Sequence, residues 1–246
     1  MPEAQPKSAT LAKWREELGK DFKSAVVLPA SVWGEPDWPL RNVERARSEI
    51  RAFAGAVKSL RPVAVVARSP AALRPGSAAF EKFLTLVPDL KTIAPRVVWD
   101  PAGVWERDAA KRAVRTIGVL VVADPLHDDV AGEPIVYARM RGLGADHRYH
   151  SGRLEDLADA LEGAEEAFVV FDTQDAWKEA KRMKTVLAGP REAREERAAD
   201  AVLGGSAGAP DEDEEDEEDD GNADDDDDDD DDNVGTDDDE NGFGAP

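Results

Sequence analysis

The sequence lacks cysteine, a long apolar run and an apolar leader. With no cysteine among 246 residues, a disulfide framework, a thiolate metal site and a cysteine nucleophile are excluded. The longest apolar runs have four to six residues, and a membrane-spanning helix needs about 20. The first residues contain no basic start followed by an apolar run, so we expect no secretory signal. Together these absences predict a cytoplasmic protein that does not enter a membrane.

Positive charge is missing from one segment of the chain. Residues 211–246 hold 23 acidic residues and no Lys or Arg, whereas residues 1–210 balance 31 acidic against 31 basic residues. The formal net charge of −23 therefore belongs to the C-terminal segment. A neutral body argues against direct nucleic-acid binding through a positive field. A segment of one charge sign cannot bury apolar area, so we expect it to be disordered; its role is either solvation alone or recruitment of basic proteins.

The body alternates short β-branched runs with longer amphipathic stretches. Most of the short runs are continuously apolar, which is typical of strands buried on both faces. This alternation predicts a parallel sheet in an α/β fold. Six strands in about 165 residues are too few for a complete eight-stranded barrel, so an incomplete or open barrel and a doubly wound sheet both remain open. The predicted strands are residues 25–28, 63–67, 96–99, 118–122, 135–138 and 167–171, and the predicted helices are residues 43–60, 77–86, 105–117, 154–161 and 177–187.

Charged residues follow most of these strands. Because the carboxyl ends of parallel strands meet at one edge, we expect the charged residues to share a mouth there. Acids at neighbouring strand ends can coordinate a divalent metal or act as general acid and base, and arginines can bind phosphate or carboxylate bidentately. The candidate catalytic residues are Asp100, Asp124 and Asp172, and the candidate ligand-binding arginines are Arg68, Arg139 and Arg141.

A purely structural interpretation of these residues stays open. Aspartate is a common helix N-cap, and Asp-Pro after a strand is an ordinary start of a βα loop. Arg68 and Arg141 would then simply pair with Asp100 and Asp172. Several tryptophans lie near strand ends, Trp105 among them. They either form the floor of a ligand pocket or pack in the core.

Three segments carry a family resemblance: the Asp100-Pro101 turn followed by Trp105, then Tyr137, Arg139, Gly142, Tyr149 and Gly152, and then the strand ending in Asp172-Thr173. They resemble the YecE-like TIM-barrel family, a family of unknown function (domain of unknown function, family 72). The resemblance covers residues 22–188. It implies a barrel in which the first two units are missing or rebuilt, and it adds Tyr149 to the ligand-binding candidates.

Departures from the family pattern fall at the mouth of the barrel. Arg141 and Asp100 stand where the family has histidine, and Asp172-Thr173 replaces Asn-Asn. We therefore expect a protein that binds or hydrolyses a small phosphate-containing or anionic ligand, with a divalent metal as its candidate cofactor. The alternative is a non-catalytic scaffold whose acidic segment recruits basic partners. The expected organisation is a helical extension over residues 1–22, a YecE-like barrel over 23–190, a charged helix over 191–203 and a disordered polyacidic tail over 204–246.

Overall fold

The computed structural model describes residues 6–18, 22–142 and 148–189. Contacts divide the chain into Met1–Leu203 and Gly204–Pro246, and the described residues all belong to the first of these units. The predicted charged helix over 191–203 and the predicted polyacidic tail over 204–246 lie outside the described residues.

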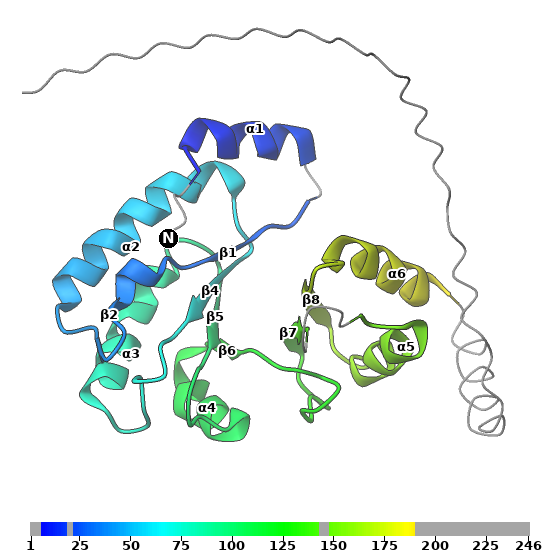
Figure 1. The fold of residues 1–246 in the computed structure, drawn as a ribbon. Helices are drawn as coiled ribbons and strands as arrows, with labels where there is room; N and C mark the ends of the chain where they lie inside the picture. Colours follow the sequence, from blue (N-terminus) through cyan, green and yellow to red (C-terminus); the bar gives the residue numbers. More distant parts are fainter. Residues whose placement is uncertain (1–5, 19–21, 143–147, 190–246) are drawn as a thin grey trace, which may run out of the picture. The chain divides into compact units, whose positions relative to one another are not determined.

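Six parallel strands form the framework of this unit (Figure 1). They pair as a four-stranded sheet in the order β1-β4-β5-β6 and as a two-stranded sheet of β7 and β8. A single parallel bridge between Ala123 and Ala138 joins the two sheets. The α/β class with a parallel sheet is thus confirmed. The strands are β1 (Ala25–Val27), β4 (Ala64–Arg68), β5 (Arg96–Asp100), β6 (Leu120–Val121), β7 (Ile135–Arg141) and β8 (Glu166–Asp172).

The sequence patterns missed one short hairpin. A 3₁₀ turn over Ala30–Trp33 leads into β2 (Gly34–Glu35), which pairs antiparallel with β3 (Trp38–Pro39). Gly34 has a φ of 77°, a left-handed conformation that favours glycine. Two-residue strands carry too little periodicity to be found by pattern alone.

In the described residues, one α-helix precedes the parallel strands, four lie between them and one follows the last. Asn42 caps α2 by accepting a hydrogen bond from the Arg45 amide, and Ser77 caps α3 through the Phe80 amide. Before the last helix, Thr173 donates its hydroxyl to Glu179, and Asp175 occupies the cap position. Within the described ranges, no helix has both the length and the apolar character needed to cross a membrane. The helices are α1 (Ser8–Leu18), α2 (Val43–Val57), α3 (Ala78–Leu90), α4 (Arg107–Val114), α5 (Ser151–Ala160) and α6 (Ala176–Ala188), with 3₁₀ turns at Lys58–Leu60 and Arg115–Ile117.

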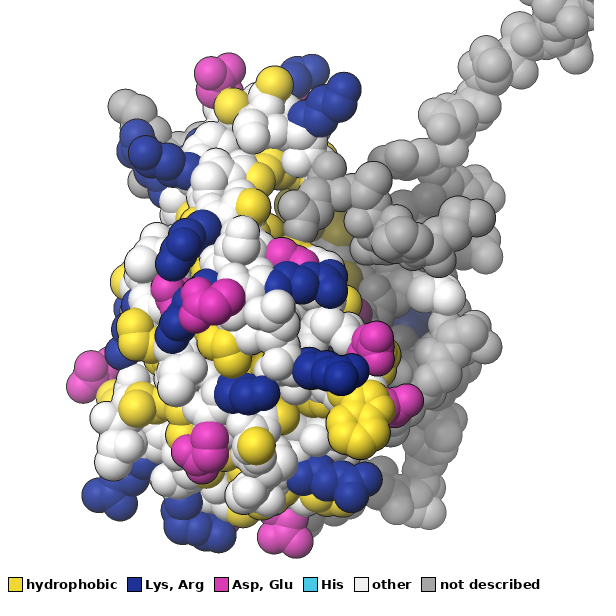
Figure 2. All heavy atoms as spheres, turned by 90° about the vertical axis from the view of Figure 1, so that its left-hand side faces the viewer, with side chains coloured by type: hydrophobic (Ala, Val, Ile, Leu, Met, Phe, Trp, Pro, Cys, Tyr) yellow, Lys and Arg dark blue, Asp and Glu magenta, His cyan; other side chains and the backbone are white. Residues whose placement is uncertain are grey.

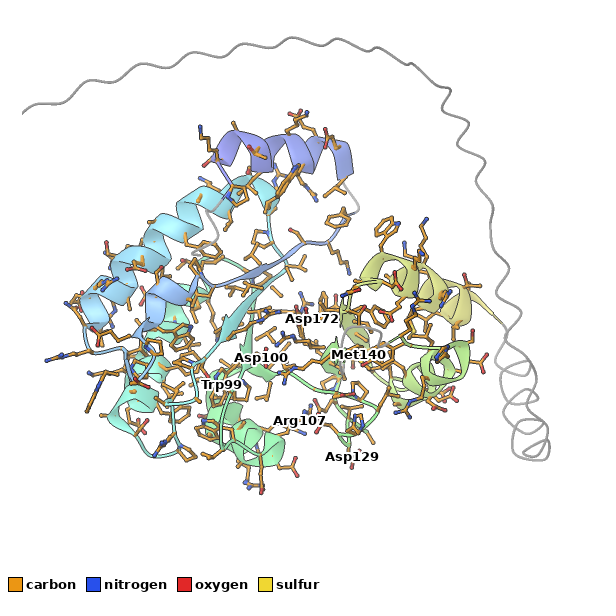
Figure 3. The ribbon with its side chains drawn as sticks, in the orientation of Figure 1. Trp99, Asp100, Arg107, Asp129, Met140 and Asp172 are labelled. Carbon is orange, nitrogen blue, oxygen red and sulfur yellow. The ribbon has the colours of Figure 1, made fainter. Side chains whose placement is uncertain are left out.

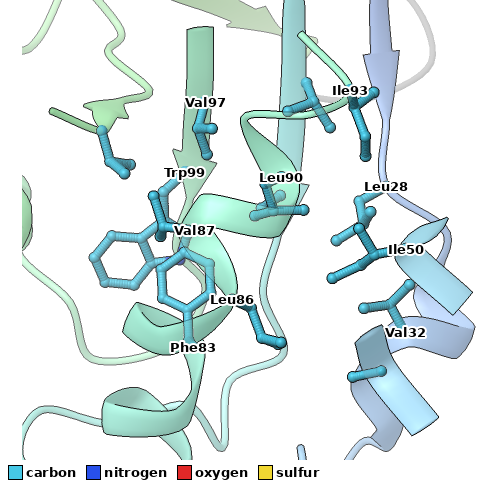
Figure 4. Packing of buried hydrophobic residues seen from close by; sticks show 14 of the residues in the cluster. Leu28, Val32, Ile50, Phe83, Leu86, Val87, Leu90, Ile93, Val97 and Trp99 are labelled. Carbon is cyan, nitrogen blue, oxygen red and sulfur yellow. The ribbon is translucent and has the colours of Figure 1, made fainter. Parts of the chain in front are cut away.

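The helices cover one face of each sheet. Figure 1 shows α2, α3 and α4 beside the four-stranded sheet and α5 and α6 beside β7 and β8. In Figure 4, the apolar side chains of α3 lie against Val97 and Trp99 of β5. A separate cluster packs Met140 and Phe171 of the second sheet against Leu154, Leu157 and Met183 of the two helices. Each buried apolar side chain of this size contributes about 1.5–3 kcal/mol, so these two clusters stabilise the arrangement of the strands.

The surface of the unit mixes both charge signs. Figure 2 shows Lys and Arg side chains interspersed with Asp, Glu and apolar groups on the side that carries α2. This pattern is the one expected from a body whose acidic and basic residues balance.

Candidate functional site

The carboxyl ends of β4, β5, β7 and β8 bring five of the predicted site residues together. Strand register places Arg68 beside Asp100 and Arg141 beside Asp172. Arg139 lies two positions before Arg141 and therefore on the same face of β7. Figure 3 shows Asp100 and Asp172 at the ends of their strands.

Asp100 is the centre of this cluster. Its carboxylate is only 5% exposed, and it accepts hydrogen bonds from Arg139 Nη1 at 2.5 Å and from Arg141 Nη2 at 2.8 Å. The Nε atom of Arg68 lies 3.7 Å from the same carboxylate. A buried carboxylate is tolerated only when its charge is paired and its lone pairs are satisfied. Three arginines from two strands supply the opposite charge and the hydrogen-bond donors that Asp100 needs.

Arg139 links Asp100 to Asp172. Its Nε donates to Asp172 Oδ2 at 3.0 Å, and its Nη2 donates to the same oxygen. Burial by itself lowers the pKa of Arg139, but the hydrogen bonds and charges of Asp172 and Asp100 outweigh it and raise that pKa. The hydrogen bond from Arg139 in turn holds the pKa of Asp172 below its ordinary value. Both groups are therefore charged at neutral pH, and Arg139 is held in place from two sides.

The cluster keeps spare donors at its surface. Its three arginines and two aspartates leave one positive charge in excess. Arg68 and Arg141 are 43% and 56% exposed, and each guanidinium has five N–H donors in a planar fork. Their contacts with Asp100 occupy few of these donors. The remaining donors of each arginine are therefore available to an anion without loss of the contact with the buried carboxylate.

A cleft of about 240 Å³ opens between the ends of β5, β6 and β7. Asp100, Arg139 and Arg141 line it, together with Trp105 and Asp124. The cleft is large enough for a small anion such as a phosphate monoester. Of the three arginines of the cluster, Arg139 and Arg141 line the cleft and Arg68 does not.

Asp124 has a local role in this arrangement. Its Oδ1 accepts from the Leu126 amide at 3.2 Å, its Oδ2 lies 3.0 Å from His127 Nδ1, and its own amide donates to Asp128. These contacts stabilise the turn that follows β6. The structure thus brings Asp100 and Asp172 into the arginine cluster and leaves Asp124 at the wall of the cleft. The catalytic roles of all three stay predictions.

Trp105 and Tyr149 lie at the margin of the cluster. The Trp105 ring packs against Trp99 and Phe80, with centroids 4.9 and 5.0 Å apart, so most of its contacts are with the core. Tyr149 is buried against Phe171, and its hydroxyl donates to the Arg141 carbonyl at 2.9 Å. Tyr149 therefore supports the backbone that carries Arg141.

Glu179 is a site-supporting residue that the sequence patterns missed. This fully buried carboxylate of α6 accepts from the Tyr149 amide at 2.8 Å and from the Thr173 hydroxyl. It thereby ties the segment after β7 to the segment after β8, next to Arg141 and Asp172. The available signal was its spacing, because Glu179 lies four residues before the buried Met183 and so shares its inward helix face.

Tyr137 is the second residue that was missed as a site residue. It is buried on the same face of β7 as Arg139. Burial raises the pKa of Tyr137, against the opposing effect of the Arg68 and Arg139 charges. Strict alternation with the two arginines was the signal that could have placed it.

The raised pKa values of the two tyrosines predict how the stability of the fold changes at alkaline pH. Burial also raises the pKa of Tyr149, with Asp124 and Glu179 acting in the same direction, and the chain contains only two tyrosines. Because both folded pKa values exceed the unfolded value of about 10, the neutral phenols stabilise the fold below that pH. This contribution is lost as the pH rises through the folded values. Near-ultraviolet titration should show that both tyrosines ionise at a higher pH in the folded protein than in urea. A normal titration of either phenol in the folded protein would contradict the burial.

Metal ligands do not gather at the cluster. No group of three or more His, Asp or Glu side chains suited to a metal ion occurs in the described part of the chain. The arginines hold the carboxylates of Asp100 and Asp172 instead. The chemistry that this geometry favours is binding of an anion.

Comparisons with known proteins add no relative to these observations. The chain matches no protein-family model, no curated protein and no solved structure.

Proposed function

We propose that the protein binds a small anionic ligand, such as a phosphate monoester or a carboxylate, through Arg68 and Arg141. The observation that carries this proposal is the buried Asp100 carboxylate, which gathers three arginines at one mouth. A carboxylate that served only to neutralise charge would need one partner. Here it organises a cationic surface with exposed donors.

Preorganisation supports this assignment. Arg139 is 15% exposed and is held by Asp100 and Asp172, so the centre of the cluster is rigid before any ligand arrives. Planar guanidinium groups bind phosphate and carboxylate oxygens in pairs. Side chains already ordered by a scaffold lose little conformational entropy on binding. Hydrolysis of the ligand, with Asp100, Asp124 or Asp172 as acid or base, stays a prediction.

The strand arrangement supports an open TIM-barrel-like fold, the architecture implied by the resemblance to the YecE-like family. The six parallel strands follow one another in chain order. At their amino ends Lys23 Nζ lies 3.2 Å from Glu166 Oε1, and Arg96 also bonds Glu166. Those contacts join the start of β8 to the segment that leads into β1 and to the start of β5. In such barrels ligands bind at the carboxyl ends of the strands, where the arginine cluster lies.

Calorimetric titration with methyl phosphate tests the proposal. Charge-assisted hydrogen bonds contribute about 1.5–3 kcal/mol each, and solvent exposure reduces that value. We therefore expect Arg68→Ala and Arg141→Ala each to weaken binding about tenfold, and the double variant to abolish it.

Arg45→Ala is the matched control. Arg45 is 62% exposed and pairs with Glu49 on α2, so its loss removes a similar charge away from the cluster. It should leave the affinity unchanged. If the control and the cluster variants weaken binding equally, only the net charge of the protein matters and the proposed site is wrong.

A further inference from the structure

The face of the sheet that carries the arginine cluster also carries an apolar layer. Side chains alternate between the two faces of a strand, so residues two positions apart share a face. On each of four strands an apolar or aromatic residue precedes the charged one by two positions. The pairs are Val66 and Arg68, Val98 and Asp100, Tyr137 and Arg139, and Val170 and Asp172. The apolar members pack together in one cluster.

The centre of this layer is buried, with Val66, Val98 and Tyr137 at most 5% exposed, and water reaches the residues around it. Val27 of β1 stands beside Val66 in the register and is 45% exposed. Leu120, Val122 and Phe168 contact the buried members of the cluster but remain only partly buried themselves. Exposed apolar area costs about 25 cal/mol per Å². Partly exposed apolar side chains around a packed centre, beside charged groups, are a candidate contact surface for an apolar ligand.

A second group of charges limits the layer at the opposite end. Arg96 and Glu166 form an ion pair at the amino ends of β5 and β8, and the Arg96 guanidinium lies 5.4 Å from the Phe168 ring centroid. Arg96 and Asp100 are four residues apart on β5. That separation leaves about 13 Å of strand between the two charged levels.

We propose that this layer binds the alkyl chain of an anionic amphiphile whose head group is held by Arg68 and Arg141. The inference rests on the proposed anion site and names the class of ligand that the site takes. Excess positive charge at the carboxyl ends selects the anionic head, and the apolar residues below it accept the chain. The Arg96–Glu166 pair limits that chain to about eight to ten carbons, from the strand length available.

A series of n-alkyl phosphates provides the test. Methyl, butyl and octyl phosphate are titrated into the full-length protein below their micelle concentrations, with octanoate and octanol as further arms. Each methylene that enters an apolar site improves binding by up to about fourfold. We expect octyl phosphate to bind at least tenfold more tightly than butyl phosphate. Octanoate should also bind, because its carboxylate, like a phosphate, can pair with the arginines. Octanol should not bind, because it has no charged head group.

Val27→Asn tests the apolar layer directly. The side chain is half-exposed in the free protein, so the substitution leaves the fold intact. It should remove most of the advantage of octyl over methyl phosphate and leave methyl phosphate binding unchanged. Val104→Asn is the matched control, because Val104 is 70% exposed and belongs to the loop before α4.

The outcomes separate this inference from the proposed function. Methyl phosphate binding that depends on Arg68 and Arg141, with no gain from a longer chain, overturns the amphiphile and leaves the anion site standing. Equal binding of octanol and octyl phosphate overturns the role of the head group. Absence of binding by every alkyl phosphate overturns both.

Discussion

Asp100→Asn is expected to lower the free energy of unfolding by about 3–5 kcal/mol, the cost of leaving buried charges unpaired. The carboxylate is the shared partner of Arg68, Arg139 and Arg141. An asparagine in its place loses the negative charge and points N–H donors at guanidinium donors. Urea denaturation followed by circular dichroism measures the change. The same variant should lose methyl phosphate binding, because its arginines are no longer ordered.

Asp124→Asn is the control for this substitution. Asparagine retains the oxygen that accepts from the Leu126 amide, so the turn after β6 should persist with a loss below about 1 kcal/mol. Equal losses in the two variants would contradict the central role of Asp100. From the sequence alone, a catalytic Asp100 would leave thermal stability nearly unchanged when replaced by asparagine. The three arginines reverse that expectation.

Trp99→Ala is the second substitution with a large expected effect. Trp99 is fully buried and packs against Phe80 and Phe83 at centroid distances of 5.5 Å. Its indole also donates to the Ser69 hydroxyl at 3.0 Å. Truncating a buried aromatic side chain costs about 3–5 kcal/mol, because the neighbours only partly fill the cavity. Urea denaturation of the variant measures this loss against a typical total stability of about 5–15 kcal/mol.

Trp177→Ala is the control, because it removes an exposed indole and so shows how much of the stability loss in Trp99→Ala comes from burial. Trp177 is 72% exposed on α6, where Lys181 lies over its ring. Its removal should change stability by less than about 1 kcal/mol. A comparable loss in both variants would mean that the cluster around Trp99 does not stabilise the fold. Because Trp99 and Ser69 adjoin Asp100 and Arg68, Trp99→Ala should also weaken anion binding.

The strands were predictable because their sequence signal is local. Each of the six apolar runs became a parallel strand, since continuous β-branched sequences favour strands buried on both faces. The shared edge of the charged residues followed from the parallel topology. Pairing of Arg141 with Asp100 rather than with Asp172 did not follow, because it depends on how β7 stands across from β5.

Other parts of the site needed the packed fold. Glu179 resembles an ordinary solvent-facing acid in a lysine-rich helix, and its burial comes from the packing of α6 against the segments after β7 and β8. Trp105 resembles a pocket residue, yet most of its ring contacts are with the core. In both cases long-range contacts decide the environment, and single-sequence patterns contain no long-range contacts.

The sequence by itself determined the α/β class, the parallel strands and the separation of a neutral body from an acidic segment, because composition and periodicity act locally. Only the tertiary structure decided that Asp100 gathers three arginines, that Asp124 stabilises its own turn and that an apolar cluster lies below the charges. Those features depend on the order and spacing of strands far apart in the chain. That spatial arrangement turns scattered strand-end charges into a candidate binding site.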